Sequence, residues 1–520
     1  MTSRRRGARV AFAILCGAAP ACSAVLGLQP PPPEDTVAGG TDATAADVAV
    51  TDAPAQDRAS SEGAAAADAA LEAATSPTHC ADIEGVDDSG ATYSPLSAVD
   101  DDGGSTAWSA FATSLLPHPS AFSGGVFDGR YVYLAGRAAT QARYDTTGTF
   151  EDVGSWTEYL VSALGIQGGF EGAVFDGRYV YYVPYLSGTV HESVAARYDT
   201  TGPFTAAASW TTFDLSTLVP DAGSPVAGFW GGSFDGRYVY FVPHNDGLPF
   251  GRIVRYDTTA PDGGAAAVSA LPANDAGMTD AGMTSAFDDP SQWQSFDLSS
   301  LGPQVIGYLG AVFDGTSLYL VPSANDALDS VIHGGDNSIA VRLHTAGDFT
   351  AASAFSTIDL TTVNGLLTGF MGGAFDGQYV YLAPRAFGIV PRFDTAANFE
   401  AISAWSTYDV TRQFAADAAT PDFAGAAFDG RFVYFVPAGS GFTSLTRYDT
   451  SSTFGADCAW STLDLARISP GDAGPGTYVG AVFDGQFLYL VPAGVFPVLR
   501  FEAKTPPAQP MLPAYYGSFL

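Results

Sequence analysis

The chain repeats one pattern of apolar and polar positions. In residues 172–184, "GAVFDGRYVYYVP", two apolar runs flank Asp176-Gly177, a dipeptide that favours a tight hairpin turn. The second run is apolar at successive positions instead of alternating, which is typical of a strand covered on both faces. The pattern predicts an antiparallel hairpin with another sheet packed on each side.

Near-copies of this hairpin return along the chain. Each contains Phe-Asp-Gly, which begins at Phe127, Phe175, Phe234, Phe313, Phe375, Phe428 and Phe483. Intervals of 48 to 79 residues separate these positions, a range typical of propellers and solenoids. A strand led by Arg comes next, such as "RYDT" at Arg143, and then a strand led by an aromatic residue, such as "SWTEYL" at Trp156. Four strands in each repeat predict a propeller blade.

The two ends of the repeat array complete each other. No fourth strand follows Arg500, whereas "AWSAF" at Trp108 precedes the first Phe-Asp-Gly without a blade of its own. We therefore predict an all-β, seven-bladed β-propeller of four-stranded blades, closed by pairing the N-terminal strand with the last blade. Such closure removes unpaired strand edges from the ring.

The order of elements resembles kelch repeats. The resemblance is carried by "YVYLAGR", "ARYDTTGTF", "SWTEYL" and "GGFEGAVFDG" within residues 131–175, and it covers residues 107–502. It implies a propeller and a family that includes protein-binding modules and some oxidases. The chain departs from the kelch pattern because its second strand ends mostly in Val-Pro or Ala-Pro and not in Gly-Gly. Since one fold hosts many functions, the resemblance does not decide between them.

The N-terminal residues are typical of an export signal. The chain begins with several arginines, which a short apolar stretch at 10–18 follows. Ala19-Pro20-Ala21 then comes directly before Cys22. Two interpretations stay open: ordinary signal cleavage before Cys22, or lipidation of Cys22, which resembles bacterial lipoproteins. We favour lipidation, because a Pro-, Ala- and Asp-rich stretch follows. Ser23 then implies the outer membrane or the cell surface, and the alternative is a periplasmic or secreted soluble protein.

These features divide the chain into five parts. We expect a signal at 1–21, a disordered tether at 22–79, an extension onto the propeller at 80–106, the propeller at 107–505 and a tail at 506–520. Exported proteins can form disulfides. We predict that Cys80 and Cys458 are paired, which would attach the incoming chain to the closing part of the ring.

The formal net charge is −33. Nucleic acid is excluded as a partner and anionic lipid is repelled, because binding to phosphates needs Lys and Arg. We expect a monomer that reaches the membrane only through a lipid anchor. The repeated Asp is expected to form turns, and the repeated Arg of "RYDT" to pair with a blade carboxylate. Calcium at the repeated acids is an alternative role.

Binding residues are expected where the blades differ. The position after the second strand and the position just before the Phe-Asp-Gly strand vary between repeats, and both belong to the same face of the ring. Their variable residues could form a ligand-binding mouth with rings for stacking and charges for orientation. The candidate ligand-binding residues are Arg137, Glu171, Tyr185, Trp230, His244 and Arg385.

Histidines supply a candidate metal site. His191, His244 and His333 fall in loops of consecutive blades on this same face, and three imidazoles can bind zinc or copper. The sequence lacks the residues that several other catalytic mechanisms need. Its one lysine is Lys504, so a Schiff-base lysine and a phosphate-binding Walker loop are both ruled out. The Gly-x-Ser-x-Gly motif of serine hydrolases is also absent from the sequence. No catalytic residue is assigned.

The sequence favours a binding module for a protein or a glycan. Two alternatives remain: an enzyme on the same face, either a metal-dependent oxidase or a glycan-cleaving enzyme, and a structural protein of the envelope. A transition metal or calcium is the candidate cofactor, and its identity is unknown.

Overall fold

A computed structural model describes most of the repeat array. The chain divides into two compact units, Met1–Ala74 and Thr75–Leu520, and every described residue belongs to the second. The structure describes residues 90–97, 107–187, 189–218, 226–259, 286–323, 336–439, 441–468 and 476–510. The predicted signal, tether, lipidation site Cys22, disulfide partner Cys80 and ligand His333 lie outside these ranges. No helix in the described part is long and apolar enough to cross a membrane.

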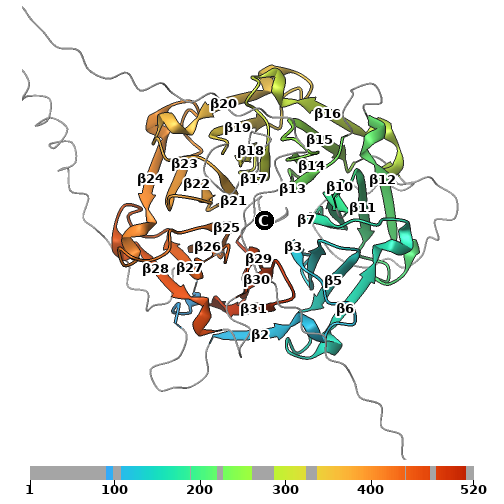
Figure 1. Cartoon of the computed structure of the whole chain (residues 1–520), viewed down its shortest axis with the longest axis horizontal. Helices are drawn as coiled ribbons and strands as arrows, with labels where there is room; N and C mark the ends of the chain where they lie inside the picture. Colours follow the sequence, from blue (N-terminus) through green and yellow to red (C-terminus); the bar gives the residue numbers. More distant parts are fainter. Residues whose placement is uncertain are drawn as a thin grey trace, which may run out of the picture. The chain divides into compact units, whose positions relative to one another are not determined.

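Seven four-stranded antiparallel sheets surround a central axis (Figure 1). The innermost strands are β3 (Phe122–Phe127), β7 (Phe170–Phe175), β13 (Phe229–Phe234), β17 (Tyr308–Phe313), β21 (Phe370–Phe375), β25 (Phe423–Phe428) and β29 (Tyr478–Phe483). The second strands are β4 (Tyr131–Gly136), β8 (Tyr179–Pro184), β14 (Tyr238–Pro243), β18 (Ser317–Pro322), β22 (Tyr379–Pro384), β26 (Phe432–Pro437) and β30 (Phe487–Pro492). The third strands are β5 (Thr140–Asp145), β11 (Val194–Asp199), β15 (Arg252–Asp257), β19 (Ile339–His344), β23 (Ile389–Asp394), β27 (Ser444–Asp449) and β31 (Pro497–Glu502). The outer strands are β6 (Trp156–Leu160), β12 (Trp210–Asp214), β16 (Trp293–Asp297), β20 (Phe355–Asp359), β24 (Trp405–Asp409), β28 (Trp460–Asp464) and β2 (Trp108–Ala112).

The last blade joins the two ends of the array, as the sequence predicts. Its strand order is β2-β31-β30-β29, with Trp108 opposite Phe501. A second pairing connects the same chain ends: β1 (Thr92–Tyr93) lies antiparallel to β32 (Lys504–Thr505). The all-β, seven-bladed propeller and its closure are therefore confirmed.

Short 3-10 helices flank the outer strands. Those before an outer strand are η2 (Val153–Ser155), η4 (Ala207–Ser209), η6 (Ala286–Asp288), η7 (Pro290–Gln292), η9 (Ala352–Ala354), η11 (Ile402–Ala404) and η13 (Asp457–Ala459). Those after an outer strand are η1 (Thr113–Leu115), η3 (Val161–Leu164), η5 (Leu215–Leu218), η8 (Leu298–Ser300), η10 (Leu360–Thr362), η12 (Val410–Gln413) and η14 (Leu465–Arg467). We call the side with the loops between second and third strands and between blades the loop face. The side with the Phe-Asp-Gly turns is the turn face.

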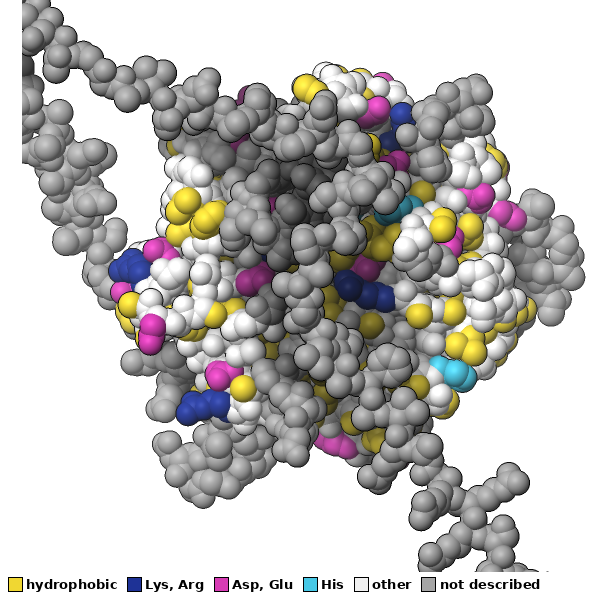
Figure 2. Space-filling model, in the orientation of Figure 1, with side chains coloured by type: hydrophobic (Ala, Val, Ile, Leu, Met, Phe, Trp, Pro, Cys, Tyr) yellow, Lys and Arg dark blue, Asp and Glu magenta, His cyan; other side chains and the backbone are white. Residues whose placement is uncertain are grey.

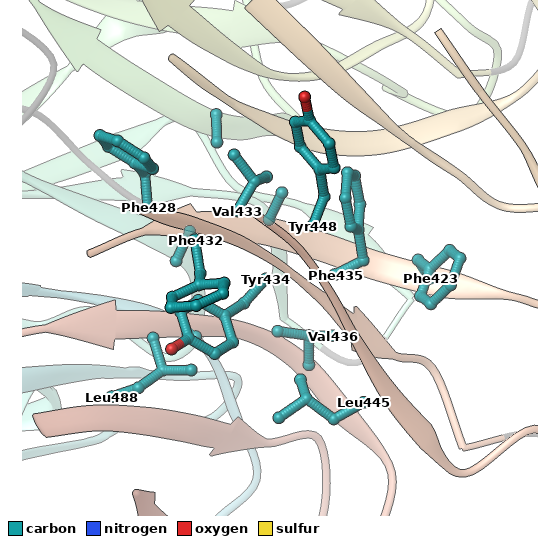
Figure 3. Packing of buried hydrophobic residues seen from close by; sticks show 14 of the residues in the cluster. Phe423, Phe428, Phe432, Val433, Tyr434, Phe435, Val436, Leu445, Tyr448 and Leu488 are labelled. Atoms are coloured by element: carbon teal, nitrogen blue, oxygen red, sulfur yellow. The ribbon is translucent and has the colours of Figure 1, made fainter. Parts of the chain in front are cut away.

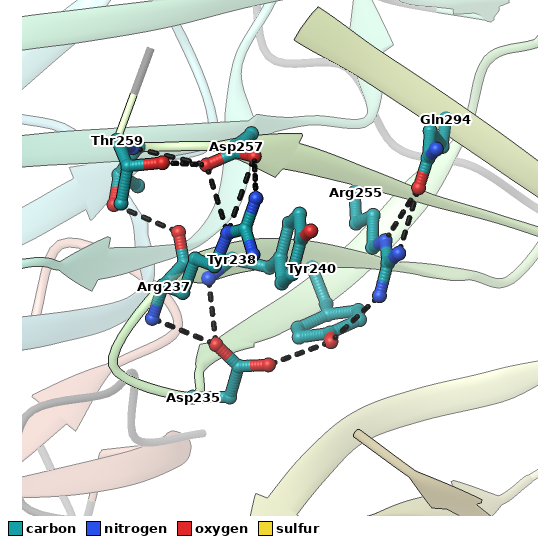
Figure 4. A network of polar contacts seen from close by, with 9 residues as sticks. Asp235, Arg237, Tyr238, Tyr240, Arg255, Asp257, Thr259 and Gln294 are labelled. Carbon is teal, nitrogen blue, oxygen red and sulfur yellow. Dashed lines mark hydrogen bonds and ion pairs between the residues drawn. The ribbon is translucent and has the colours of Figure 1, made fainter. Parts of the chain in front are cut away.

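The Asp of Phe-Asp-Gly holds the turn and also a buried tyrosine. In blade 3, Asp235 Oδ1 accepts hydrogen bonds from the backbone N–H groups of Arg237 and Tyr238, and Oδ2 accepts one from the Tyr240 hydroxyl at 2.7 Å (Figure 4). The same carboxylate–hydroxyl bond joins Asp128 and Tyr133, Asp176 and Tyr181, Asp314 and Tyr319, Asp376 and Tyr381, Asp429 and Tyr434, and Asp484 and Tyr489. The predicted turn-forming role of this Asp is confirmed.

The repeated Arg of "RYDT" packs on aromatic rings, which corrects the predicted pairing with a carboxylate. Arg255 lies 3.8 Å over the ring of Tyr238 and 4.3 Å over that of Phe349 in the next blade. The ion pair is made by a different arginine, the one after Phe-Asp-Gly: Arg237 lies 2.7 Å from Asp257 (Figure 4). A delocalised guanidinium suits the stacked position, because it is weakly hydrated and attracted to ring faces.

Apolar side chains fill both sides of every blade. In β26, Phe432 and Tyr434 lie beside Leu488 of the next blade (Figure 3), and the Tyr434 ring is 6.2 Å from that of Phe501. Farther out, aromatic rings of neighbouring outer strands stack, each pair contributing roughly 0.5–1.5 kcal/mol beyond the area it buries. The stacked pairs are Phe111 with Trp156, Tyr159 with Trp210, Phe213 with Trp293, Phe296 with Phe355, and Tyr408 with Trp460.

Candidate functional site

Five of the six sequence-predicted binding residues converge on the loop face of blades 1 to 3, and Arg385 belongs to blade 5. We define the central site as Arg137, Glu171, Tyr185, Trp230, His244 and His191. Two kinds of position supply most of it: the second residue of an inner strand and the residue that directly follows a second strand. Figure 2 shows a basic, an acidic and a histidine side chain close together near the middle of this face.

A bulge in each inner strand sets the direction of the first kind of side chain. In β13 the pairing with β14 shifts between Phe229 and Gly232, and Gly231 has φ +69°. Glycine adopts this left-handed backbone without a steric penalty, and a bulge turns the neighbouring side chain. Trp230 directly precedes that glycine, so the bulge sets the direction of its side chain beside the central axis. Glu171 precedes Gly172, which has φ +96°, in the same way.

Arg137 connects three blades. Its Nε lies 3.0 Å from Glu171 Oε1, and its Nη2 donates a hydrogen bond of 3.3 Å to Oε2. Its guanidinium carbon lies 5.4 Å from the centre of the Trp230 ring. Arg137 belongs to blade 1, Glu171 to blade 2 and Trp230 to blade 3, so one side chain bridges positions far apart in the sequence.

Glu171 is a buried carboxyl. Only 5% of its side chain is exposed, and burial raises its pKa to about 7 although Arg137 and Ser123 act in the opposite direction. Desolvation disfavours the charged form of a carboxyl, and a single guanidinium compensates only in part. Glu171 therefore changes protonation close to neutral pH.

Four rings of blades 2 and 3 form one aromatic cluster. The Tyr185 ring lies 5.0 Å from Trp230, 5.9 Å from His244 and 5.8 Å from His191. The Trp230 and His244 rings are 5.2 Å apart and nearly perpendicular. Edge-to-face geometry of this kind is the favourable arrangement for aromatic pairs.

His244 is neutral in this cluster. Burial lowers its pKa to about 3, and the positive charge of Arg385 and the neighbouring His191 lower it further. Arg385 of blade 5 is thus close enough to His244 to affect its pKa. Among the described residues, the buried Nδ1 of His244 has no hydrogen bond partner, and neither has the Oγ of Ser323, which occupies the same position in blade 4. Buried polar atoms of this kind are uncommon and call for a partner.

The equivalent positions of blades 6 and 7 carry small or aliphatic residues. Ala438 and Ala493 follow the second strands there, and Ala424 and Val479 are the second residues of the inner strands. The repeats therefore share one scaffold and differ at the mouth, where polar and aromatic groups gather on one side.

Two of the three predicted metal ligands lie in the same cluster. His191 and His244 both contact Tyr185, whereas His333 lies outside the described residues. Within the described ranges, no three His, Cys, Asp or Glu side chains are placed to hold a metal ion. Cys458 is disulfide-bonded. Its predicted partner Cys80 is not among the described residues, so this pairing stays a prediction.

Two polar residues of the mouth were not selected from the sequence. Ser123 occupies the position of Glu171 in blade 1, and its hydroxyl donates to the backbone oxygen of Phe170. Ser323 occupies the position of His244 in blade 4. Comparing equivalent positions of the repeats is the signal that identifies both, since serine alone carries no distinctive pattern.

Comparisons with known proteins bear on the fold only. No family model matches the chain, and no curated protein matches it. Solved structures with a similar fold include a streptogramin B lyase (11% identity, TM-score 0.47, 76% of this chain and 97% of that one) and the virginiamycin B lyase of Staphylococcus aureus (12%, 0.46, 76% and 98%). YCF48 bound to a D1 peptide is another (13%, 0.45, 76% and 95%). Identities and TM-scores this low carry nothing about the chemistry of the site.

Proposed function

We propose that this chain is an exported, lipid-anchored binding module that takes a protein or a glycan on its loop face. The observation that carries the proposal is the central site, in which charged and aromatic side chains of three blades meet at one place. Trp, Tyr and Arg are the residues that contribute most to binding energy in interfaces. The kelch-like order of the repeats is consistent with this role.

A matched pair of variants tests the binding role. Trp230→Ala removes the ring at the middle of the central site, and Val479→Ala changes the same strand position in blade 7. The full chain and both variants are incubated with envelope proteins and with a glycan array. We expect Trp230→Ala to lose retained ligands by about tenfold or more and Val479→Ala to keep them. Equal retention by both variants, or no ligand for the full chain, would contradict the proposal and favour a structural envelope protein.

An enzyme on the same face is the second candidate, and Glu171 favours it. A carboxyl with a pKa near 7 can accept and donate a proton at neutral pH, as a general acid or base must. The metal-dependent form of this candidate is tested by elemental analysis of the full chain and of a His191→Ala, His244→Ala, His333→Ala variant. A stoichiometric transition metal that disappears in the variant would favour the enzyme; a chain without metal would favour the binding module.

Export and lipid anchoring rest on the sequence around Cys22. Mass spectrometry of the mature N-terminus distinguishes a lipidated Cys22 from an unmodified one. A Cys22→Ala variant should leave the membrane fraction if the anchor is a lipid, and its unchanged fractionation would contradict the anchor.

A further inference from the structure

Exposed aliphatic side chains gather on the loop face. Among the described residues, the large hydrophobic side chains that are most exposed number seven, and five of them belong to loops of this face. We call these five the aliphatic rim: Leu115, Val190, Leu248, Leu366 and Val495. They are 46% to 66% exposed; Leu115 and Val495 lie at the last blade, and the other three come from three other loops of the ring. The turn face carries the other two, Val153 and Ile402.

The aliphatic rim lies on the same face as Arg137 of the central site. Arg137 is 35% exposed, and only its Nε and Nη2 face Glu171. Among the described residues, its Nη1 makes no hydrogen bond, and a guanidinium presents five N–H donors in a fixed plane. Arg385 of blade 5 is partly buried and close enough to His244 to lower its pKa. The Nη1 group of Arg137 therefore lies beside the aromatic cluster as a donor for a ligand, in a chain whose overall charge is strongly negative.

We propose that the ligand of the loop face is a polypeptide segment that presents a carboxylate to Arg137 and apolar side chains to the aliphatic rim. This inference rests on the proposed binding function and narrows it from a protein or a glycan to a polypeptide. Arg and carboxylate form charge-assisted, bidentate hydrogen bonds, which fix orientation as well as adding affinity. The Trp230 ring, 5.4 Å from the Arg137 guanidinium carbon, and the Tyr185 ring beside it supply aromatic anchors.

The aliphatic rim favours a polypeptide over a glycan as the ligand. Aliphatic side chains offer no hydrogen bond to sugar hydroxyls, whereas burying them against apolar side chains yields roughly 25 cal/mol for each Å² removed from water. Single exposed hydrophobic residues are ordinary on protein surfaces. Their concentration on one face, around a cluster of Trp, Tyr and Arg, is typical of a protein interaction site.

Selection from a phage-displayed library of random dodecapeptides tests this inference, with the full chain as bait. We expect selected peptides to be enriched in Asp or Glu together with Leu, Ile, Val or Phe. Arg137→Ala should weaken the Kd of a selected peptide about tenfold, and a Leu115→Ser, Val190→Ser, Leu248→Ser variant should do so as well. A Val153→Ser, Ile402→Ser variant is the matched control on the turn face and should bind normally.

The outcomes separate the inference from the function on which it rests. Peptides without acidic enrichment, or peptides that bind the Arg137→Ala variant equally well, would overturn the inference. Binding to a glycan array that requires Trp230, with no peptide selected, would overturn it as well and would leave the binding function intact. No ligand in either format would end both proposals.

Discussion

At the scale of single residues, the propeller holds carboxyl groups in two environments. The repeated Asp of the turn face accepts several hydrogen bonds, as Asp235 does from two backbone N–H groups and the Tyr240 hydroxyl. Glu171 is buried beside one arginine. Burial raises the pKa of Glu171 and also that of Asp176, Asp429 and Asp484, but the hydrogen bonds that these three aspartates accept act in the opposite direction.

Protonation of Glu171 should make folding stability depend on pH. Its pKa is about 7 in the folded chain against a usual 4.5, so the folded state holds a proton that the unfolded state releases in this interval. The contribution of Glu171 to the free energy of unfolding should be complete below pH 4.5 and fall by on the order of 3 kcal/mol as pH rises through 7. Urea unfolding at a series of pH values measures this dependence.

Two variants isolate the Glu171 effect. Glu171→Gln should remove that part of the pH dependence, since the amide does not titrate. Arg137→Ala should move the upper end of this pH dependence to higher pH, because the guanidinium lowers the pKa of Glu171. A slope that persists unchanged in Glu171→Gln would assign the dependence to other groups.

The bond between Asp429 and Tyr434 should be needed for stability. Both side chains are fully buried, and the hydroxyl donates to Asp429 Oδ2 at 2.8 Å. Tyr434→Phe leaves that oxygen without this donor, which should cost about 1–3 kcal/mol in urea unfolding. Tyr131→Phe is the matched control, because the described contacts of Tyr131 use its ring and backbone. Equal losses in both variants would show that the hydroxyl bond contributes little.

At the scale of elements, the bulge of each inner strand connects backbone geometry with the site. Gly231→Ala places a side chain at φ +69°, which should cost about 1–2 kcal/mol and turn Trp230 away from Tyr185. The Trp230 contribution to the near-UV circular dichroism spectrum, obtained by subtracting a Trp230→Phe variant, should then change.

Gly165→Ala is the control for backbone strain in that experiment. Gly165 also has a positive φ, +84°, and nothing lies within 4 Å of an added Cβ. We expect a similar loss of stability and an unchanged Trp230 spectrum. If Gly231→Ala also leaves the spectrum unchanged, the bulge does not orient the ring.

The sequence predicted the elements better than their contacts. Phe-Asp-Gly, "RYDT" and the aromatic-led outer strand repeat locally, so the blades and the closure through Trp108 follow from the pattern. The partner of the repeated Arg lies in a neighbouring blade, as Phe349 does for Arg255, and no local pattern identifies it. The central site was found from variation between repeats. Its bridge from Arg137 to Trp230 depends on side-chain directions that only the assembled ring sets.

At the scale of the whole molecule, the ring depends on the pairing of distant chain ends. Phe111 of β2 is buried and stacks 4.2 Å from Trp156 of blade 1. Phe111→Ala should lower the free energy of unfolding by about 3–5 kcal/mol. Weakened pairing also leaves β31 as an edge strand, so this variant should associate at high concentration, which size-exclusion chromatography detects.

Phe296→Ala is the comparison for the closing strand. Phe296 stacks 4.3 Å from Phe355 within the continuous part of the array, where the blades follow each other in sequence. A similar loss of stability without association is expected. Association by both variants would mean that closure is no weaker than any other boundary between blades.

The second pairing of the chain ends, between β1 and β32, encloses the one lysine of the sequence. Lys504 is 4% exposed, and its Nζ donates a hydrogen bond of 2.6 Å to the backbone oxygen of Asp429. An acylating reagent can reach this ε-amino group only when the chain ends separate. The rate at which the Lys504 amine is modified therefore reports how often the pairing of β1 with β32 opens.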